Sequence, residues 1–206
     1  MTSVAAAWTP AHAQVQTAAK PRMTLLVVGD SLSAEYGLAR GTGWVALLEK
    51  RLAQEKIAAT VVNASISGDT TSGGRSRLAA LLKQHQPTQV ILELGGNDAL
   101  RGLPLTMTQA NLAQMARSAK ASGAKVLIAG MQVPPNYGRQ YADDFYGLFK
   151  SVAQAEGAAL VPFLLKGVAD VPQAEALFQA DRIHPRAAAH PTILANVWPV
   201  LKPLLR

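Results

Sequence analysis

The chain has 206 residues, of which 49% are hydrophobic and 16% charged, a balance that predicts one ordered domain with a sizeable core and no stable insertion into a membrane. Cysteine is absent, which excludes disulfide bonds, thiolate catalysis and cysteine-ligated zinc. The net charge of +7 comes from scattered Lys and Arg residues, so we interpret it as a solvated surface, with attraction to anionic lipid or acyl substrates as the alternative, and expect no nucleic-acid partner.

Residues 1–22 differ in composition from the rest of the chain. The segment 1–14 is rich in alanine and almost uncharged, and its residues 11–13, Ala-His-Ala, resemble the cleavage site of a secretory signal. We therefore expect residues 1–22 to stay outside the fold, as the end of a signal peptide or as a disordered leader, with one domain over residues 23–206. A signal peptide would place the protein in the periplasm or outside the cell, whereas a leader of another kind would leave it in the cytoplasm.

Short apolar runs and longer amphipathic segments alternate along the rest of the chain. The apolar runs predict strands over residues 24–28, 60–63, 89–94, 125–129 and 158–161. The amphipathic segments predict helices over residues 44–55, 75–84, 106–122, 143–156 and 187–204. We expect Pro191 and Pro199 to limit or kink the last helix. Loops are predicted over residues 68–74, 95–98 and 131–141, where glycine, proline or polar residues dominate.

The alternation of strands and helices predicts an α/β fold, in which a five-stranded parallel sheet has helices on both faces. Ligands of such sheets bind at the carboxyl ends of the strands. The segments that follow the first three predicted strands therefore open at one rim. We expect Ser31, Gly68 and Asn97, which lie in these segments, to be neighbours in space.

Ser31 follows the first apolar run and is the candidate nucleophile. A serine hydroxyl attacks a substrate only if a base takes its proton and donors stabilise the oxyanion that forms. Ser31 and the two neighbours expected at the rim, Gly68 and Asn97, also have a purely structural interpretation. The Ser31 hydroxyl can cap a turn, Gly68 can supply a positive φ angle, and Asn97 can form an Asx turn.

The chain contains the histidines His12, His85, His184 and His190. His12 lies in the leader and His85 at the end of a predicted helix, where a cap or an exposed side chain is expected. The other two each precede a proline, but only His184 has an acid, Asp181, three residues before it. Such an acid can fix the tautomer of the imidazole, whereas a solvated pair is the alternative. Three other carboxylates lie next to candidate site residues and are rivals of Asp181: Asp30, Asp69 and Asp98. Their alternative role is to shape the loops in which they lie.

Four ordered blocks of the sequence resemble the SGNH, or GDSL, hydrolase family. They are GDSLS at 29–33, NASISGDT at 63–70, GGND at 95–98 and DRIHP at 181–185. The resemblance covers the chain from about residue 23 to the end, and within the family it is strongest to periplasmic multifunctional esterases with thioesterase, protease, lysophospholipase and arylesterase activities. It implies a three-layer α/β/α flavodoxin-like fold.

The resemblance also implies a role for each site residue. Ser31 would be the nucleophile, His184 the general base and Asp181 the acid that orients it. The oxyanion donors would be the backbone N–H groups of Ser31 and Gly68 and the side-chain amide of Asn97. The sequence contains no HExxH helix, Walker A loop or dinucleotide fingerprint, so no metal and no cofactor is implied.

The implied function is a serine ester hydrolase of broad specificity. It would act on small acyl esters, aryl esters, thioesters and lysophospholipids through an acyl-Ser31 intermediate, and we expect a monomer. The alternatives are a carbohydrate or acetyl esterase of the same family and a non-catalytic acyl- or lipid-binding protein.

Apolar residues on the rim loops are candidates for substrate binding, with core packing as the alternative. They are Leu100, Leu103, Pro104, Met131, Val133 and Pro134. Two positions differ from a common family pattern, because Glu35 and Arg182 stand where relatives often have glycine. We expect the Glu35 carboxylate to be an exposed loop charge or, alternatively, to face the site and disfavour anionic substrates.

Overall fold

The computed structural model describes residues 23–206, so the predicted leader lies outside the described residues. Its centre is one sheet of five parallel strands in the order β2-β1-β3-β4-β5. The strands are β1 (Met23–Gly29), β2 (Ala59–Asn63), β3 (Gln89–Glu93), β4 (Lys125–Ala129) and β5 (Ala159–Val161). The predicted parallel sheet is therefore confirmed, and the chain changes direction across the sheet between β1 and β3.

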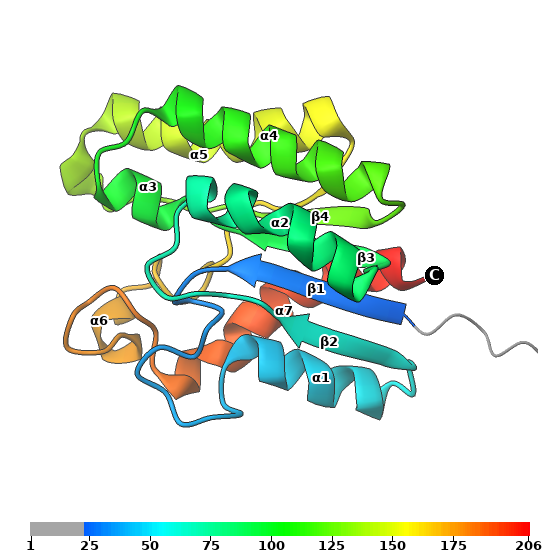
Figure 1. The fold of residues 1–206 in the computed structure, drawn as a ribbon. Coiled ribbons are helices and arrows are strands. Elements are labelled where there is room, and N and C mark those ends of the chain that lie inside the picture. Colours follow the sequence, from blue (N-terminus) through cyan, green and yellow to red (C-terminus); the bar gives the residue numbers. More distant parts are fainter. Residues whose placement is uncertain (1–22) are drawn as a thin grey trace, which may run out of the picture.

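Helices cover both faces of the sheet (Figure 1). One layer contains α2 (Thr71–His85), α4 (Leu105–Ala121) and α5 (Arg139–Glu156), and the other contains α1 (Trp44–Gln54) and α7 (His190–Leu201). The short helices α3 (Gly96–Leu100) and α6 (Ala174–Leu177) lie at the edge where the strands end, opposite the C-terminus in Figure 1. The three-layer α/β/α fold is confirmed.

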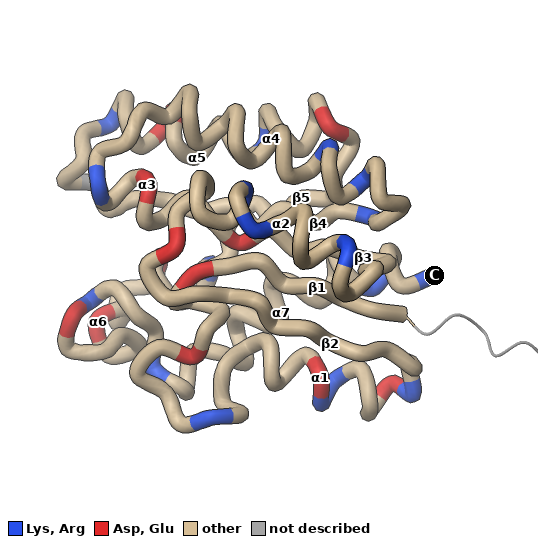
Figure 2. The backbone as a smooth tube through the Cα atoms, in the orientation of Figure 1, with Lys and Arg blue, Asp and Glu red and all other residues tan. Residues whose placement is uncertain are grey.

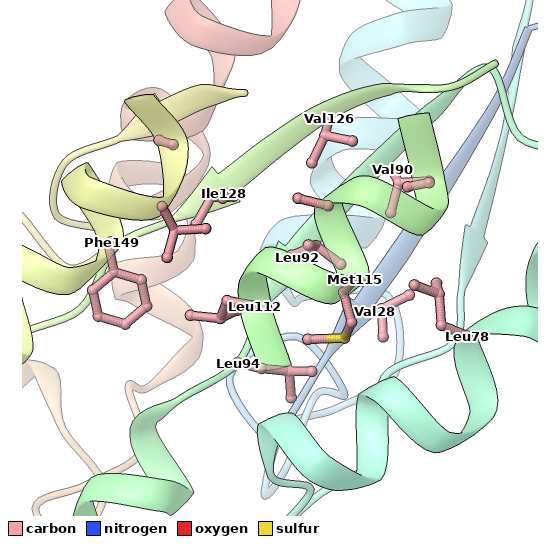
Figure 3. Packing of buried hydrophobic residues seen from close by; sticks show 14 of the residues in the cluster. Val28, Leu78, Val90, Leu92, Leu94, Leu112, Met115, Val126, Ile128 and Phe149 are labelled. Atoms are coloured by element: carbon pink, nitrogen blue, oxygen red, sulfur yellow. The ribbon is translucent and has the colours of Figure 1, made fainter. Parts of the chain in front are cut away.

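The core is divided by the sheet, because successive side chains of a strand point to opposite faces. In β1, Leu26 and Val28 pack toward α2, α4 and α5, whereas Leu25 and Val27 pack toward α1 and α7. All four side chains are fully buried. Figure 3 shows the first of these clusters, in which side chains of β1, β3 and β4 meet those of the covering helices. The continuous apolar strands of the sequence are thus explained by burial on both faces.

Three predicted element boundaries differ from the structure. The helix α2 begins at Thr71 inside the predicted loop 68–74, because Thr70 caps it by accepting the N–H of Gly73 at 3.2 Å. The segment after β3 is the short helix α3 rather than a loop, and α5 begins at Arg139 rather than at residue 143. The sequence pattern also gave no prediction of α6.

The predicted closing helix over 187–204 is divided into three parts. A 3-10 turn over Ala187–Ala189 precedes α7, and another over Lys202–Leu205 follows it. Pro191 lies in the first turn of α7, where its missing N–H costs nothing, and Pro199 is inside the helix without ending it. Pro191 therefore limits the helix as expected, and the helix ends two residues beyond Pro199.

The charged residues are distributed over the molecule. Figure 2 shows Lys and Arg on both helical layers and on the loops, interspersed with Asp and Glu. Among residues 23–206, no helix combines the length and the apolar character needed to cross a bilayer.

Gly130, directly after β4, provides a test of the close packing at the rim. A Cβ atom there would collide with the backbone oxygens of Pro162 and Val161, which cannot move aside easily. We expect Gly130→Ala to lower the free energy of unfolding by about 1–3 kcal/mol. Gly147, an exposed position inside α5, has open space around it, so Gly147→Ala should raise the same free energy by about 0.5–1 kcal/mol. Urea unfolding followed by circular dichroism measures both, and a Gly130→Ala variant as stable as the wild type would contradict the packing.

Candidate active site

The candidate nucleophile lies in the first turn after β1. The Asp30 carbonyl accepts the N–H groups of Ser33 at 3.2 Å and Ala34 at 3.0 Å, so the chain coils tightly around Ser31. A Cβ atom at Gly29 would lie 2.6 Å from Glu93 Oε2, so the strand has to end in glycine here. The Ser31 Oγ lies 2.8 Å from Nε2 of His184.

The loop that carries His184 has its own acid. His184 Nδ1 lies 2.7 Å from Asp181 Oδ2, and Asp181 Oδ1 accepts the N–H groups of Ile183 at 2.9 Å and His184 at 3.0 Å. These bonds, led by the backbone and side-chain bonds from His184, lower the pKa of Asp181 to about 2. An ionised Asp181 favours the tautomer in which Nδ1 carries the proton, which leaves Nε2 as an acceptor for the Ser31 hydroxyl.

His190 does not compete for this role. It is buried, and its Nδ1 accepts the N–H of Trp44 at 2.9 Å at the beginning of α1. Burial lowers the pKa of His190, although the bond to the Pro185 backbone opposes this change. The structure therefore places His184, and not His190, against Ser31.

Two further predicted site residues lie on the loops next to Ser31. Asn97, in the first turn of α3, donates from Nδ2 to Asp30 Oδ2 at 3.0 Å, which leaves its second amide hydrogen for another acceptor. Gly68 has a φ angle of +78°, and its carbonyl accepts a bond from Arg101 at 2.7 Å. This loop is held beside β1 because the N–H of Ile66 donates to the Gly29 carbonyl at 3.0 Å.

A pair of buried carboxyl groups lies under the nucleophile turn. Asp30 is 2% exposed and Glu93 is fully buried. Glu93 Oε2 accepts the Ser33 hydroxyl at 2.6 Å and the Asp30 N–H at 3.3 Å, and Trp44 Nε1 donates to Ser33 Oγ at 3.2 Å. Sequence reasoning missed Glu93. The only signal in the sequence is that Glu93 is an acid at the end of an otherwise apolar strand, and no nearby motif gives that acid a role.

Burial controls the charge of this pair. Burial raises the pKa of Asp30 to about 6, while the Leu32 N–H, His184 and Asn97 oppose this rise. Burial, and next the nearby Asp30 charge, raise the pKa of Glu93 well above its usual value. The raised pKa favours the neutral form of Glu93 under the site, because an uncharged acid can be accommodated in a buried position at far lower cost than a carboxylate.

The other two rival carboxylates shape loops, as the sequence suggested. Asp98 is buried and accepts bonds from the Thr71 N–H at 2.8 Å, the Thr71 hydroxyl and the Thr108 hydroxyl at 3.2 Å. It thereby joins the beginnings of α2, α3 and α4. Asp69 forms an ion pair with Arg77 at 2.8 Å. These contacts fix the Gly68 loop relative to Asn97.

The six candidate substrate-binding residues have different surroundings. Leu100 is 45% exposed, Pro104 and Pro134 are exposed, and Leu103 and Val133 are partly buried. Met131 is only 5% exposed, and its sulfur would lie 3.2 Å from a Cβ atom at Gly96. Met131 therefore packs in the core beside α3, which agrees with the alternative of core packing for this residue.

Glu35 and Arg182 both have left-handed backbone conformations, with φ angles of +59° and +57°. The Glu35 carboxylate accepts the N–H groups of Gly43 at 2.7 Å and Gly41 at 3.0 Å. Burial opposes ionisation, but these bonds outweigh it and lower the pKa of Glu35. Glu35 is therefore a loop charge, but it is partly buried rather than exposed, and its carboxylate is bound into its own loop. Arg182 is exposed and lies 3.7 Å from Glu175.

Among the described residues 23–206, no cluster of three or more His, Asp or Glu side chains is arranged to hold a metal ion. What the rim does bring together is a hydroxyl, an imidazole and a carboxylate in a hydrogen-bonded series, next to an amide and a glycine loop. This set can remove a proton from a serine and donate hydrogen bonds to a new negative charge.

Comparison with known proteins agrees with this chemistry. The model of the GDSL-like Lipase/Acylhydrolase family matches residues 27–191. Esterase TesA of Pseudomonas aeruginosa is 57% identical over 182 residues, which cover 88% of this chain and 89% of that protein. A crystal structure of TesA has a TM-score of 0.85 and 56% identity, and the match covers 88% of this chain and 99% of that one.

Two other relatives are similar over most of the chain. An arylesterase of Vibrio mimicus is 43% identical over 169 residues, covering 82% of this chain and 83% of that protein. The thioesterase 1/protease 1/lysophospholipase L1 of Escherichia coli strain K12 is 43% identical over 182 residues, covering 88% and 85%.

The raised pKa of Glu93 predicts a specific pH dependence of stability. In the unfolded chain a glutamate loses its proton above about pH 4.3, whereas the raised pKa favours its retention in the native state, so unfolding should release a proton. Stability should therefore fall as pH rises from about 5 to 7, with this group contributing up to about 1.4 kcal/mol per pH unit. Glu93→Gln cannot ionise, and its slope should be shallower by that amount.

Urea unfolding at pH 5, 6 and 7 measures the slope. Glu49→Gln, at an exposed position of α1, is the matched control and should keep the wild-type slope. Equal slopes for the wild type and Glu93→Gln would show that native Glu93 is ionised.

Proposed function

Because the chain belongs to the GDSL-like lipase/acylhydrolase family and is an ester-bond hydrolase, we propose that it cleaves its substrates by transferring their acyl group to Ser31. The observation that carries the proposal is the series of bonds from Asp181 through His184 to Ser31, at 2.7 Å and 2.8 Å. A protein that only binds acyl groups would need no such series.

In the acylation half of the reaction, His184 Nε2 takes the hydroxyl proton while Ser31 Oγ attacks the substrate carbonyl carbon. The negative charge that forms on the carbonyl oxygen would be stabilised by the N–H groups of Ser31 and Gly68 and by the free amide hydrogen of Asn97. Asp181 stabilises the imidazolium. His184 then gives the proton to the departing oxygen or sulfur, and the alcohol or thiol leaves.

In the second half, water attacks the acyl-Ser31 ester and His184 takes a proton from that water. Collapse of the second tetrahedral intermediate releases the carboxylic acid, and the proton returns from His184 to Ser31 Oγ. The enzyme is regenerated at the end of the second half, because all four proton transfers use the same imidazole.

The proposed substrates are small acyl esters, aryl esters, thioesters and lysophospholipids. The names of the similar esterase, arylesterase and thioesterase/lysophospholipase support this breadth. So does the rim, where Leu100 is exposed and offers apolar surface. Every group of the proposed site comes from a single chain, which supports a monomer as the working unit.

The nucleophile and the base can be tested directly. Ser31→Ala and His184→Ala should each lower kcat/KM for p-nitrophenyl butyrate by about 10⁴-fold or more, because members of a triad act as a unit. A serine-directed ethylphosphonate should label Ser31 in the wild type, as mass spectrometry of the peptide would show.

His190→Ala is the matched control for the base. It should lose stability by about 1–3 kcal/mol, because the Trp44 N–H loses its acceptor, yet retain activity per folded molecule. An inactive but folded His190→Ala together with an active His184→Ala would reassign the base.

If Asn97 donates to the oxyanion, its removal should lower kcat and leave KM almost unchanged. Asn97→Ala should lower kcat by about 10²–10³-fold, because an oxyanion donor acts mainly in the transition state, while KM changes little. Steady-state kinetics with p-nitrophenyl butyrate measures this loss. Asn136→Ala, at an exposed asparagine, is the control, and a folded Asn97→Ala with wild-type kcat would exclude the role.

A further inference from the structure

The ring of Tyr36 lies against the imidazole of His184. Their centroids are 4.3 Å apart and their planes are inclined at 38°. Tyr36 is 49% exposed, whereas the His184 side chain is only 16% exposed. Tyr36 therefore covers part of the imidazole and also presents a large open ring surface directly beside it.

The position of this ring is set by the loop that also carries Ser31. The Tyr36 N–H donates to the Ser31 carbonyl at 3.4 Å, and the Leu38 N–H donates to the Glu35 carbonyl at 3.0 Å. The left-handed turn at Glu35 is supported by its carboxylate, which binds the N–H groups of Gly41 and Gly43. An exposed aromatic ring is thus carried by a backbone with several internal bonds.

Gln179 connects this turn to the histidine loop. Its Nε2 donates to the Tyr36 carbonyl at 2.9 Å and to the Pro185 carbonyl at 3.2 Å. Its own backbone N–H donates to the His184 carbonyl at 2.8 Å. The amide also fills the space beside Gly37, where a Cβ atom would collide with Gln179 Oε1. Gln179 therefore connects the two loops, with its side chain bound to Tyr36 and Pro185 and its backbone bound to His184.

We propose that Tyr36 is a specificity-determining residue that contacts the leaving group, and that Gln179 is the positioning residue that holds it there. This inference rests on the proposed function. During acylation, His184 Nε2 passes its proton to the leaving oxygen or sulfur, so the leaving group lies next to the imidazole. A ring that lies against the imidazole and has an open surface is in reach of the same group, and an aryl leaving group gains more from it than an alkyl group does.

The test compares two substrates that form the same acyl-enzyme, phenyl butyrate and ethyl butyrate. Tyr36→Ala should lower the ratio of their kcat/KM values, phenyl over ethyl, by about two- to tenfold. Tyr36→Phe keeps the ring and should keep the ratio. The ratio for phenyl acetate against phenyl butyrate, which reports on the acyl group, should be the same in Tyr36→Ala and the wild type.

Gln179→Glu keeps the shape of the side chain but removes the two bonds that Nε2 donates, to the carbonyls of Tyr36 and Pro185. It should lower the phenyl-over-ethyl ratio in the same direction as Tyr36→Ala, and the double variant should fall no further than Tyr36→Ala alone, since the two residues act as a unit. Gln173→Glu, at an exposed glutamine before α6, is the matched control and should keep the wild-type ratio.

The outcomes separate this inference from the proposed function. Equal losses on both esters, with Ser31 still labelled by the ethylphosphonate, would overturn the leaving-group role and leave the proposed function standing. A Gln179→Glu ratio equal to that of the wild type would overturn the positioning role. A wild type that hydrolyses neither ester and is not labelled would overturn the proposed function, and this inference with it.

Discussion

The pairing of β1 with β3 is the constraint on which the rest of the site depends. Its register places Gly29 opposite Glu93, and Glu93 Oε2 then accepts the Asp30 N–H and the Ser33 hydroxyl beyond the end of the strand. A neutral carboxyl group thus continues the sheet's hydrogen bonding into the turn that carries Ser31. A Cβ atom at position 29 would lie 2.6 Å from Glu93 Oε2, so glycine allows this close approach, and burial raises the pKa of the acid that supports the turn.

Bonds between loops that are distant in sequence then assemble the site around this turn. Asp30 binds the Asn97 amide, the Gly68 carbonyl binds Arg101, and Asp98 joins the beginnings of α2 and α3. Because each bond crosses from one strand end to another, the loops at the rim behave as one connected unit. A parallel sheet leaves its loops on a common edge, and these polar contacts convert that shared edge into a defined geometry.

The apolar runs were sufficient to predict the sheet, and the acid three residues before His184 distinguished it from the other histidines. The roles of Ser31 and His184 as nucleophile and base came from the resemblance to the hydrolase family. Prediction from the sequence failed where contacts between distant segments of the chain determined the structure. Gly73 and Gly74 disfavour a helix by propensity, yet α2 includes them because Thr70 caps it and because Gly74 packs closely on Leu94. The bond of Glu93 to Ser33 spans 60 residues of the chain and the bond of Gln179 to Tyr36 spans 143, so no local pattern contains either partner.

Glu35 and Arg182 show how residues other than glycine can occupy left-handed positions in loops beside the site. Both occupy left-handed conformations, which cost an ordinary residue about 1–2 kcal/mol compared with glycine. At Glu35 this cost is offset within the same loop, because the carboxylate binds the N–H groups of Gly41 and Gly43 and so stabilises the turn that presents Tyr36. The turn of Arg182 lies inside the bonds from Asp181 Oδ1 to Ile183 and His184, which hold the loop against the strain. The backbone conformation is therefore the constrained quantity at both positions, and a non-glycine residue is compatible with the site where neighbouring bonds stabilise that conformation.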